Sequence, residues 1–163
     1  MNNQQKFFDF KKFVTHDEDK MRQNYFNNLA ENHINNQIKM KLKVGGDDSF
    51  QNIKLININC LKNFDKDIIE LYVNGIKIEF RDHIYAIKKG TYDIKLIFKM
   101  NIKNCFEMFR MCNNVIEIDL SCFDTSNVTN MGYMFSFCGN LKKINLVNID
   151  TRNVTDMESM FRE

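Results

Sequence analysis

The residues in this chain that could do chemistry are five cysteines, three histidines and a few acidic clusters. Cys112 and Cys138 invite a metal or redox interpretation, but they lie 26 residues apart, and the chain has no C-x-x-C pair. Residues 101–163 also contain no histidine, so the ligands of a zinc site are missing there. We therefore expect no metal site, and we expect reduced thiols that pack as small apolar side chains.

Catalytic patterns are equally scarce. Nucleophilic catalysis by cysteine would need a thiol to meet His16, His33 or His83, and nothing in the sequence favours such a pair. The run Asp17–Asp19 lacks the glycine and closing glutamate of a calcium loop. We predict that the protein is not an enzyme and has no catalytic residues and no cofactor. An enzyme built on the β-rich segment is the alternative, and it would need a polar pocket lined by His83 or Cys60.

Composition and charge argue against a nucleic-acid-binding protein and against a membrane-spanning protein. The net charge is +2, and no basic stripe with interleaved aromatic residues marks a nucleic-acid surface. The abundance of asparagine, isoleucine and lysine, with no proline, is typical of an AT-rich genome. The first residues are polar with no apolar stretch behind them, and no run approaches the ~18 apolar residues of a membrane span. We therefore predict a cytoplasmic protein, with a surface location only by an unrecognised route.

The elements that would position these residues come from an internal repeat of 26 residues. The segment Asp124–Met131 recurs as Asp150–Met157, and the same offset relates the Met-Phe pairs at 108–109, 134–135 and 160–161. Units of this size cannot bury their apolar faces alone, so they stack in arrays. We predict about two and a half coils over residues 101–163.

Each coil is expected to contain a strand, a turn and a short helix. Apolar and polar residues alternate over 116–120 and again over 144–146, which is typical of strands. Stacked in register, these strands would form a parallel ladder that places Glu117 beside Lys143. A helix would follow in each copy. Its expected N-caps are Asn104, Asn130 and Asp156, and its expected ends are Asn113 and Gly139.

The stretch from Ile118 to Met131, continued by Met134-Phe135 and Cys138, resembles the BspA-type leucine-rich repeat of bacterial surface proteins and protists. The resemblance covers about residues 101–163. It implies a right-handed α/β leucine-rich-repeat-like solenoid of short parallel strands plus short helices, with roles in adhesion or protein binding. The missing signal peptide departs from the surface members of that family and weighs against an adhesin.

The segment 37–100 is predicted to be a small antiparallel β cap domain that covers the first coil. Its clearest element is a hairpin at Asn74-Gly75, with Val73 facing Ile76 and Leu71 facing Ile78. An independent binding domain is the alternative for this segment. Residues 1–36 are predicted to be a polar segment with one marginal helix.

The favoured function is a non-catalytic protein–protein interaction module. Its binding face would consist of the outward residues of the repeat strands, which are Glu117, Asp119, Ser121, Lys143 and Asn145. A structural or self-associating protein is the alternative, either as the first part of a longer repeat protein or adhesin or through an open C-terminal coil. The predicted partner is a protein or a second copy, with no nucleic acid and no membrane span.

Overall fold

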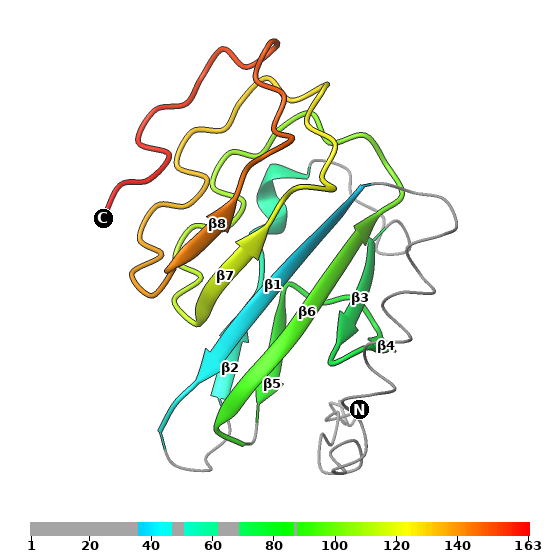
Figure 1. Cartoon of the computed structure of the whole chain (residues 1–163), viewed down its shortest axis with the longest axis vertical. Helices are drawn as coiled ribbons and strands as arrows, with labels where there is room; N and C mark the ends of the chain where they lie inside the picture. The colour runs from blue at the N-terminus through cyan, green and yellow to red at the C-terminus, as the bar shows by residue number, and fades with distance from the viewer. Residues whose placement is uncertain (1–35, 47–50, 62–68, 87) are drawn as a thin grey trace, which may run out of the picture.

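The computed structural model describes residues 36–46, 51–61, 69–86 and 88–163 (Figure 1). The predicted N-terminal segment 1–36 and its helix lie outside these residues, apart from Asn36. His16, His33 and the acidic run at 17–19 lie outside them as well.

Strands form almost all of the regular structure in the described residues. In chain order the elements are β1 (Gln37–Val44), β2 (Gln51–Lys54), the 3-10 helix η2 (Ile58–Cys60), β3 (Ile69–Val73), β4 (Ile76–Ile78), β5 (His83–Ala86), β6 (Gly90–Phe98), β7 (Val115–Asp119) and β8 (Lys143–Asn145). A six-stranded sheet has the order β4-β3-β6-β1-β7-β8. β2 and β5 pair in a two-stranded sheet that lies behind it in Figure 1.

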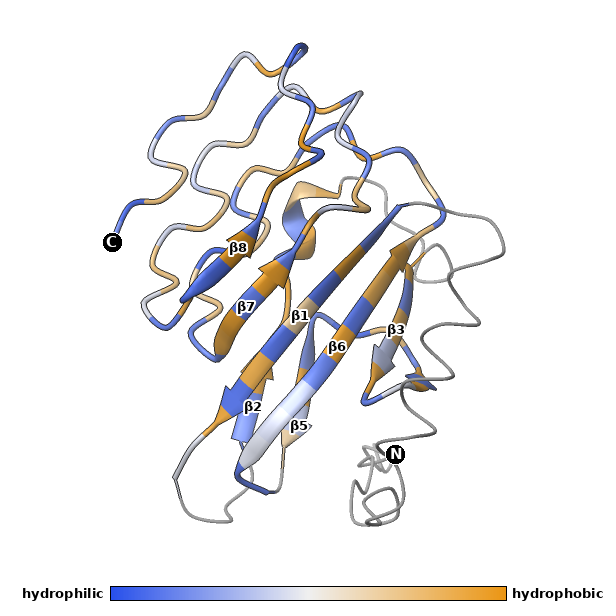
Figure 2. Ribbon diagram, in the orientation of Figure 1, coloured by the Kyte–Doolittle hydropathy of each residue, from blue (hydrophilic) through white to orange (hydrophobic). Residues whose placement is uncertain are grey.

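Strand β1 lies at the centre of the large sheet. It pairs antiparallel with β6 on one side and with β7 on the other, so that Met40 faces both Ile94 and Ile118. Its alternating sequence explains this position, because Ile38, Met40, Leu42 and Val44 are all buried while the lysines between them face outward. Figure 2 shows the alternation as orange and blue bands along the strand.

The predicted hairpin is confirmed in position and register. Val73 pairs with Ile76 and Leu71 with Ile78. The turn residues Asn74 and Gly75 have φ values of 50° and 80°, the left-handed conformations that a type I′ turn requires. Asn74 also accepts a 2.9 Å hydrogen bond through Oδ1 from the N–H of Asp93, which ties the turn to β6.

The copies of the repeat lie in parallel, as their spacing predicts. β7 pairs parallel with β8, and Glu117 lies opposite Lys143, so this part of the register is confirmed. Asn104, Asn130 and Asp156 form parallel bridges from one copy to the next. Because β7 also pairs with β1, the copies extend the same sheet that residues 37–98 begin.

The predicted helices of the repeat do not form. We call residues 104–112, 130–138 and 156–163 the three turn segments, and each contains left-handed residues where a helix was expected. Glu107, Tyr133 and Ser159 have φ values of 58°, 54° and 50°, and Met111 and Phe137 have 61° and 56°. An L-residue in this conformation cannot continue a right-handed helix.

The expected capping residues therefore have other roles. The side-chain oxygens of Asn104, Asn130 and Asp156 each accept a hydrogen bond from the N–H two residues later, at 2.8–2.9 Å, so they close tight turns instead of capping helices. Gly139 does not adopt a positive φ and does not end a helix. Four-residue turns follow one another instead, such as the one that the Met108 N–H closes by donating to the Cys105 carbonyl at 3.0 Å.

The predicted fold class is thus wrong. The described residues form a nearly all-β structure with a six-stranded mixed sheet, not an α/β solenoid with helices. The physical reason lies in the backbone N–H groups of the first two turn segments, because every second one donates to a carbonyl in the next copy of the repeat. A helix would have directed these N–H groups to carbonyls four residues earlier.

Aromatic and sulfur-containing side chains fill the space between the turn segments. Phe109 is fully buried and its ring stacks on Phe135 at 5.5 Å with an interplanar angle of 8°. Phe135 stacks in turn on Phe161 at 5.4 Å and 12°. Met108, Cys105 and Cys112 are fully buried beside them, so the repeated apolar positions form one core with the sheet.

Candidate functional site

The outer face of the large sheet carries a shallow groove of about 380 Å³ over β6, β1, β7 and β8. Four of the five predicted binding residues line it: Glu117, Asp119, Lys143 and Asn145. The remaining lining residues are Lys39, Met40, Lys41, Asp93, Ile94 and Ile118. Alternation along each strand directs the apolar members toward the core and the charged members toward solvent.

Ser121 is the predicted binding residue that does not line the groove. It follows the end of β7, where its N–H donates a 2.9 Å hydrogen bond to Asp119 Oδ1. Its carbonyl accepts a 2.8 Å bond from the side-chain amide of Asn148. These two bonds fix the turn after β7, so Ser121 supports the neighbouring carboxylate instead of lining the groove.

Charges of both signs share the groove. Lys41 on β1 forms an ion pair with Glu117 on β7, with Nζ 3.3 Å from Oε2. Lys143 lies opposite Glu117 in the strand register, yet Glu117 pairs with Lys41 instead. In the part of the chain that the structure describes, Lys39 and Lys143 form no ion pair, and both side chains are exposed.

Several polar neighbours contact the carboxylate of Asp119 in the groove. Burial alone would raise its pKa, but hydrogen bonds from Ser121, the nearby charge of Lys39 and a contact with Asn145 outweigh burial and lower the pKa. The carboxylate of Asp119 is therefore ionised at neutral pH. It offers a negative charge on β7, between the strands that carry Lys39 and Lys143.

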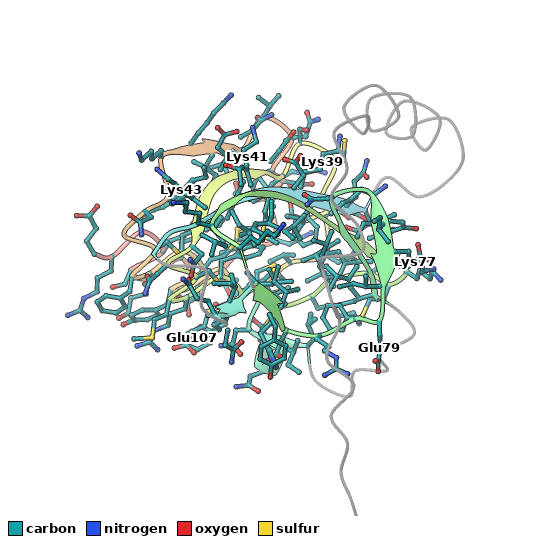
Figure 3. All side chains as sticks on the ribbon, turned by 90° about the horizontal axis from the view of Figure 1, so that it is seen from below. Lys39, Lys41, Lys43, Lys77, Glu79 and Glu107 are labelled. Atoms are coloured by element: carbon teal, nitrogen blue, oxygen red, sulfur yellow. The ribbon has the colours of Figure 1, made fainter. Side chains whose placement is uncertain are left out.

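Sequence reasoning missed the part of the groove that comes from β1 and β6. Figure 3 shows Lys39, Lys41 and Lys43 in a row on the outer side of the sheet. Their alternation with apolar residues indicates a strand with one exposed face, but it does not tell which strand lies beside it. The pairing of β1 with β7, which sets Lys39 opposite Asp119 and Lys41 opposite Glu117, places these lysines next to the repeat.

The cysteine thiols sit in apolar surroundings. Burial raises the pKa of Cys60 and of Cys112 to about 12, and burial likewise raises that of Cys105. A thiol of this kind stays protonated at neutral pH and is a poor nucleophile.

His83 contacts Asp82 at 2.7 Å and the Tyr85 hydroxyl at 3.2 Å. The absence of enzyme activity stays a prediction.

The described residues offer neither a metal site nor a membrane-spanning helix. No group of three or more histidine, cysteine or acidic side chains among them has the arrangement of a metal site. Nor does that part of the chain contain a helix with the length and apolar character needed to cross a membrane.

Fold and groove together define a class: a β-rich protein whose mixed sheet incorporates parallel copies of a 26-residue repeat. The chain belongs to the family described as "Mycoplasma protein of unknown function, DUF285", whose model matches residues 79–163. The expected membership of the BspA-type leucine-rich repeat family is thereby corrected, and with it the solenoid and surface-protein descriptions. No curated protein and no solved structure matches the chain.

Proposed function

We propose that this chain is a non-catalytic protein-binding module that uses the groove on the outer face of its sheet. The observation that carries the proposal is the convergence of Glu117, Asp119, Lys143 and Asn145 with the lysines of β1 in one groove. The sheet fixes the backbone that carries these side chains, so a partner can bind without ordering a loop.

The charges of the groove indicate the kind of partner. Three lysines and three carboxylates line it, and only Lys41 and Glu117 neutralise each other at close range. Acidic side chains of a partner would therefore pair with Lys39 and Lys143, and a basic side chain would pair with Asp119. Such complementarity sets specificity and association rate more than total affinity. We infer a polypeptide partner that carries charges of both signs.

A triple substitution tests the proposal. Glu117→Gln, Asp119→Asn and Lys143→Gln together should abolish capture of the partner that co-purifies with the wild-type chain, identified by mass spectrometry. Asparagine at 119 keeps an oxygen that can accept the Ser121 N–H, so the turn after β7 should persist.

The matched control changes three exposed charges of the same kinds elsewhere: Glu79→Gln, Glu163→Gln and Lys89→Gln. The control should capture the partner as the wild type does, and both variants should unfold at the wild-type urea concentration. Undiminished capture by the groove variant would contradict the proposal.

A further inference from the structure

The first turn segment exposes two large apolar side chains on its outward side. Phe106 and Met111 are 36% and 53% exposed, although Cys105 and Cys112 beside them in the chain are fully buried. Backbone and side-chain hydrogen bonds join this segment to residues 54–57 on one side and to the second turn segment on the other. The two side chains are therefore exposed in the interior of the stack, where neighbours on both sides are already in place.

Aromatic rings and one cation surround these apolar side chains. The ring of Phe106 packs edge-on against Tyr133, with the ring centroids 5.8 Å apart. The guanidinium carbon of Arg110 lies 5.9 Å from the ring centroid of Tyr133 and 5.6 Å from that of Phe137. Such contacts between a guanidinium and aromatic rings are attractive. We call this set the aromatic–arginine patch: Phe106, Arg110, Met111, Tyr133 and Phe137.

Arg110 is held in place but keeps unused donors. Its Nη1 donates to the carboxylate of Glu107, and its own carbonyl accepts a 3.0 Å hydrogen bond from Lys54 Nζ. Among the described residues, neither Nη2 nor the buried Nε of Arg110 has a hydrogen-bond acceptor. The side chain is 34% exposed, so an acceptor from outside can reach its guanidinium group. A carboxylate is the acceptor that this planar group binds best.

We propose that the aromatic–arginine patch binds a polypeptide segment in which an acidic side chain lies between apolar side chains. The carboxylate of the partner accepts hydrogen bonds from Arg110, beginning at Nη2. The apolar side chains of the partner cover Phe106 and Met111, which removes their surface from water. Aromatic residues, methionine and arginine are the residue types enriched at the centres of protein interfaces.

The aromatic–arginine patch is separate from the groove. Figure 3 shows Glu107, the ion-pair partner of Arg110, on the opposite side of the molecule from the row of lysines on β1. The groove residues also lie on strands, whereas the patch residues lie in the turn segments. The inference therefore goes beyond the proposed function and does not rest on it.

Two other occupants fit less well. A nucleic acid or an anionic lipid surface needs several cations to neutralise its phosphates, but Arg110 is the one cation of the patch, and the carboxylate of Glu107 lies beside it. A second copy joined patch to patch would oppose two guanidinium groups, and it would bring donors to donors instead of acceptors.

The test uses the full chain labelled with ¹⁵N and a short synthetic peptide of sequence GSLFDLFSG. Addition of the peptide should produce saturable NMR shifts at the Arg110 Nε–H and the Met111 amide. Replacing the aspartate of the peptide with asparagine should weaken binding about tenfold, because the charged acceptor is lost. Arg110→Gln should weaken binding of the aspartate peptide by a similar factor.

The matched control is Arg81→Gln, since Arg81 also pairs with a glutamate, Glu79, and is similarly exposed at 41%. This variant should bind the peptide as the wild type does. Met111→Glu is a second test that leaves Arg110 in place. Its added negative charge should repel the acidic peptide and weaken binding several-fold. Urea midpoints of all variants show that each chain is folded under the conditions of the titration.

Four results would overturn the proposal. One is the absence of saturable shifts at the patch in the folded wild-type chain. Another is equal affinity for the asparagine peptide, which would indicate unspecific apolar contact. The third is tighter binding to vesicles of anionic phospholipid than to the peptide. The fourth is the same set of shifts on raising the concentration of the chain alone, which would indicate a second copy.

The groove variant should bind the peptide unchanged. Failure of the groove proposal would therefore remain distinguishable from failure of this one.

Discussion

Lys41 on β1 and Glu117 on β7 form an ion pair, Nζ to Oε2 at 3.3 Å, where the sheet of residues 37–98 meets the first strand of the repeat. Both side chains are 41% exposed, so water and salt screen their attraction. The pair therefore gives the groove its charge pattern and adds little to stability.

A double-mutant cycle with Lys41→Ala and Glu117→Ala should give a coupling energy below about 1 kcal/mol, because exposed pairs are weak. Urea unfolding of the four proteins measures it, and the coupling should shrink further at high salt. A large, salt-independent value would show that the pair holds the two parts of the sheet together.

Glu70 on β3 is a largely buried carboxylate that three neighbouring side chains contact. Its carboxylate accepts hydrogen bonds from Lys77 at 2.7 Å and from the Tyr72 hydroxyl at 2.8 Å. It also lies 2.9 Å from Lys99 Nζ. The contacts with Lys77 and Lys99 lower the pKa of Glu70 from 4.5 to about 2. Because the folded-state pKa is depressed, the stabilisation is present above pH 4.5 and is lost as the pH falls toward 2.

We therefore expect Glu70→Gln to destabilise the protein by about 1 kcal/mol at neutral pH, and by progressively less as the pH falls below about 4.5. Urea midpoints of wild type and variant across this range measure the difference. Glu79→Gln is the control, since Glu79 is exposed and its ion pair with Arg81 lies in solvent. A destabilisation by Glu70→Gln that is independent of pH would contradict the charge argument.

The left-handed conformation of Tyr133 can be tested separately from its ring contacts. Tyr133→Val and Tyr133→Asn both remove the contacts with Phe106 and Glu158, but asparagine tolerates a φ of 54° and a β-branched residue does not. The valine variant should be less stable than the asparagine variant by about 1–2 kcal/mol in urea unfolding. Equal stabilities would favour the helix that the sequence suggested, because valine and asparagine have similar helix propensities.

Thiol reactivity reports on the packing between copies. Cys105 and Cys112 are fully buried and the pKa of each is raised, whereas Cys122 is only half-buried. Iodoacetamide at mildly alkaline pH should modify Cys122 first and leave Cys105 and Cys112 unmodified in the folded chain. Mass spectrometry after digestion gives the order. Labelling of Cys105 as fast as Cys122 without denaturant would contradict the buried core.

The features that sequence predicted well depend on neighbours in the chain or on the repeat itself. The hairpin at Asn74-Gly75 is a local turn, and the pairing of Glu117 with Lys143 follows from the spacing of 26 residues. Four of the residues that line the groove alternate along β7 and β8, so their outward position followed from the sequence, whereas their role in binding stays a prediction. In each case the periodicity determines both the element and its exposed face.

The helices of the repeat were predicted wrongly, and the neighbours of β1 were not predicted at all. Both depend on backbone hydrogen bonds between residues far apart in the sequence. The spacing of Met131, Met134 and Phe135 fits a helix equally well as a series of tight turns, because both bury every third or fourth residue. The N–H of Met131 instead bonds to Asp156 in the next copy, at 2.8 Å. Likewise, nothing near Lys39 or Lys41 in the sequence predicts that β7, more than 70 residues later, lies beside β1. The domain boundary predicted near residue 100 stays a prediction.

The central position of β1 has a consequence for biosynthesis. Of the described strands it leaves the ribosome first, yet its two neighbours are β6 and β7, which are made only after residues 90–98 and 115–119 are synthesised. Until then both edges of an apolar strand lack their partners. The nascent chain thus carries this strand without its sheet partners until residues 90–119 have been made, and the alternating lysines are the charges that limit its aggregation in that interval.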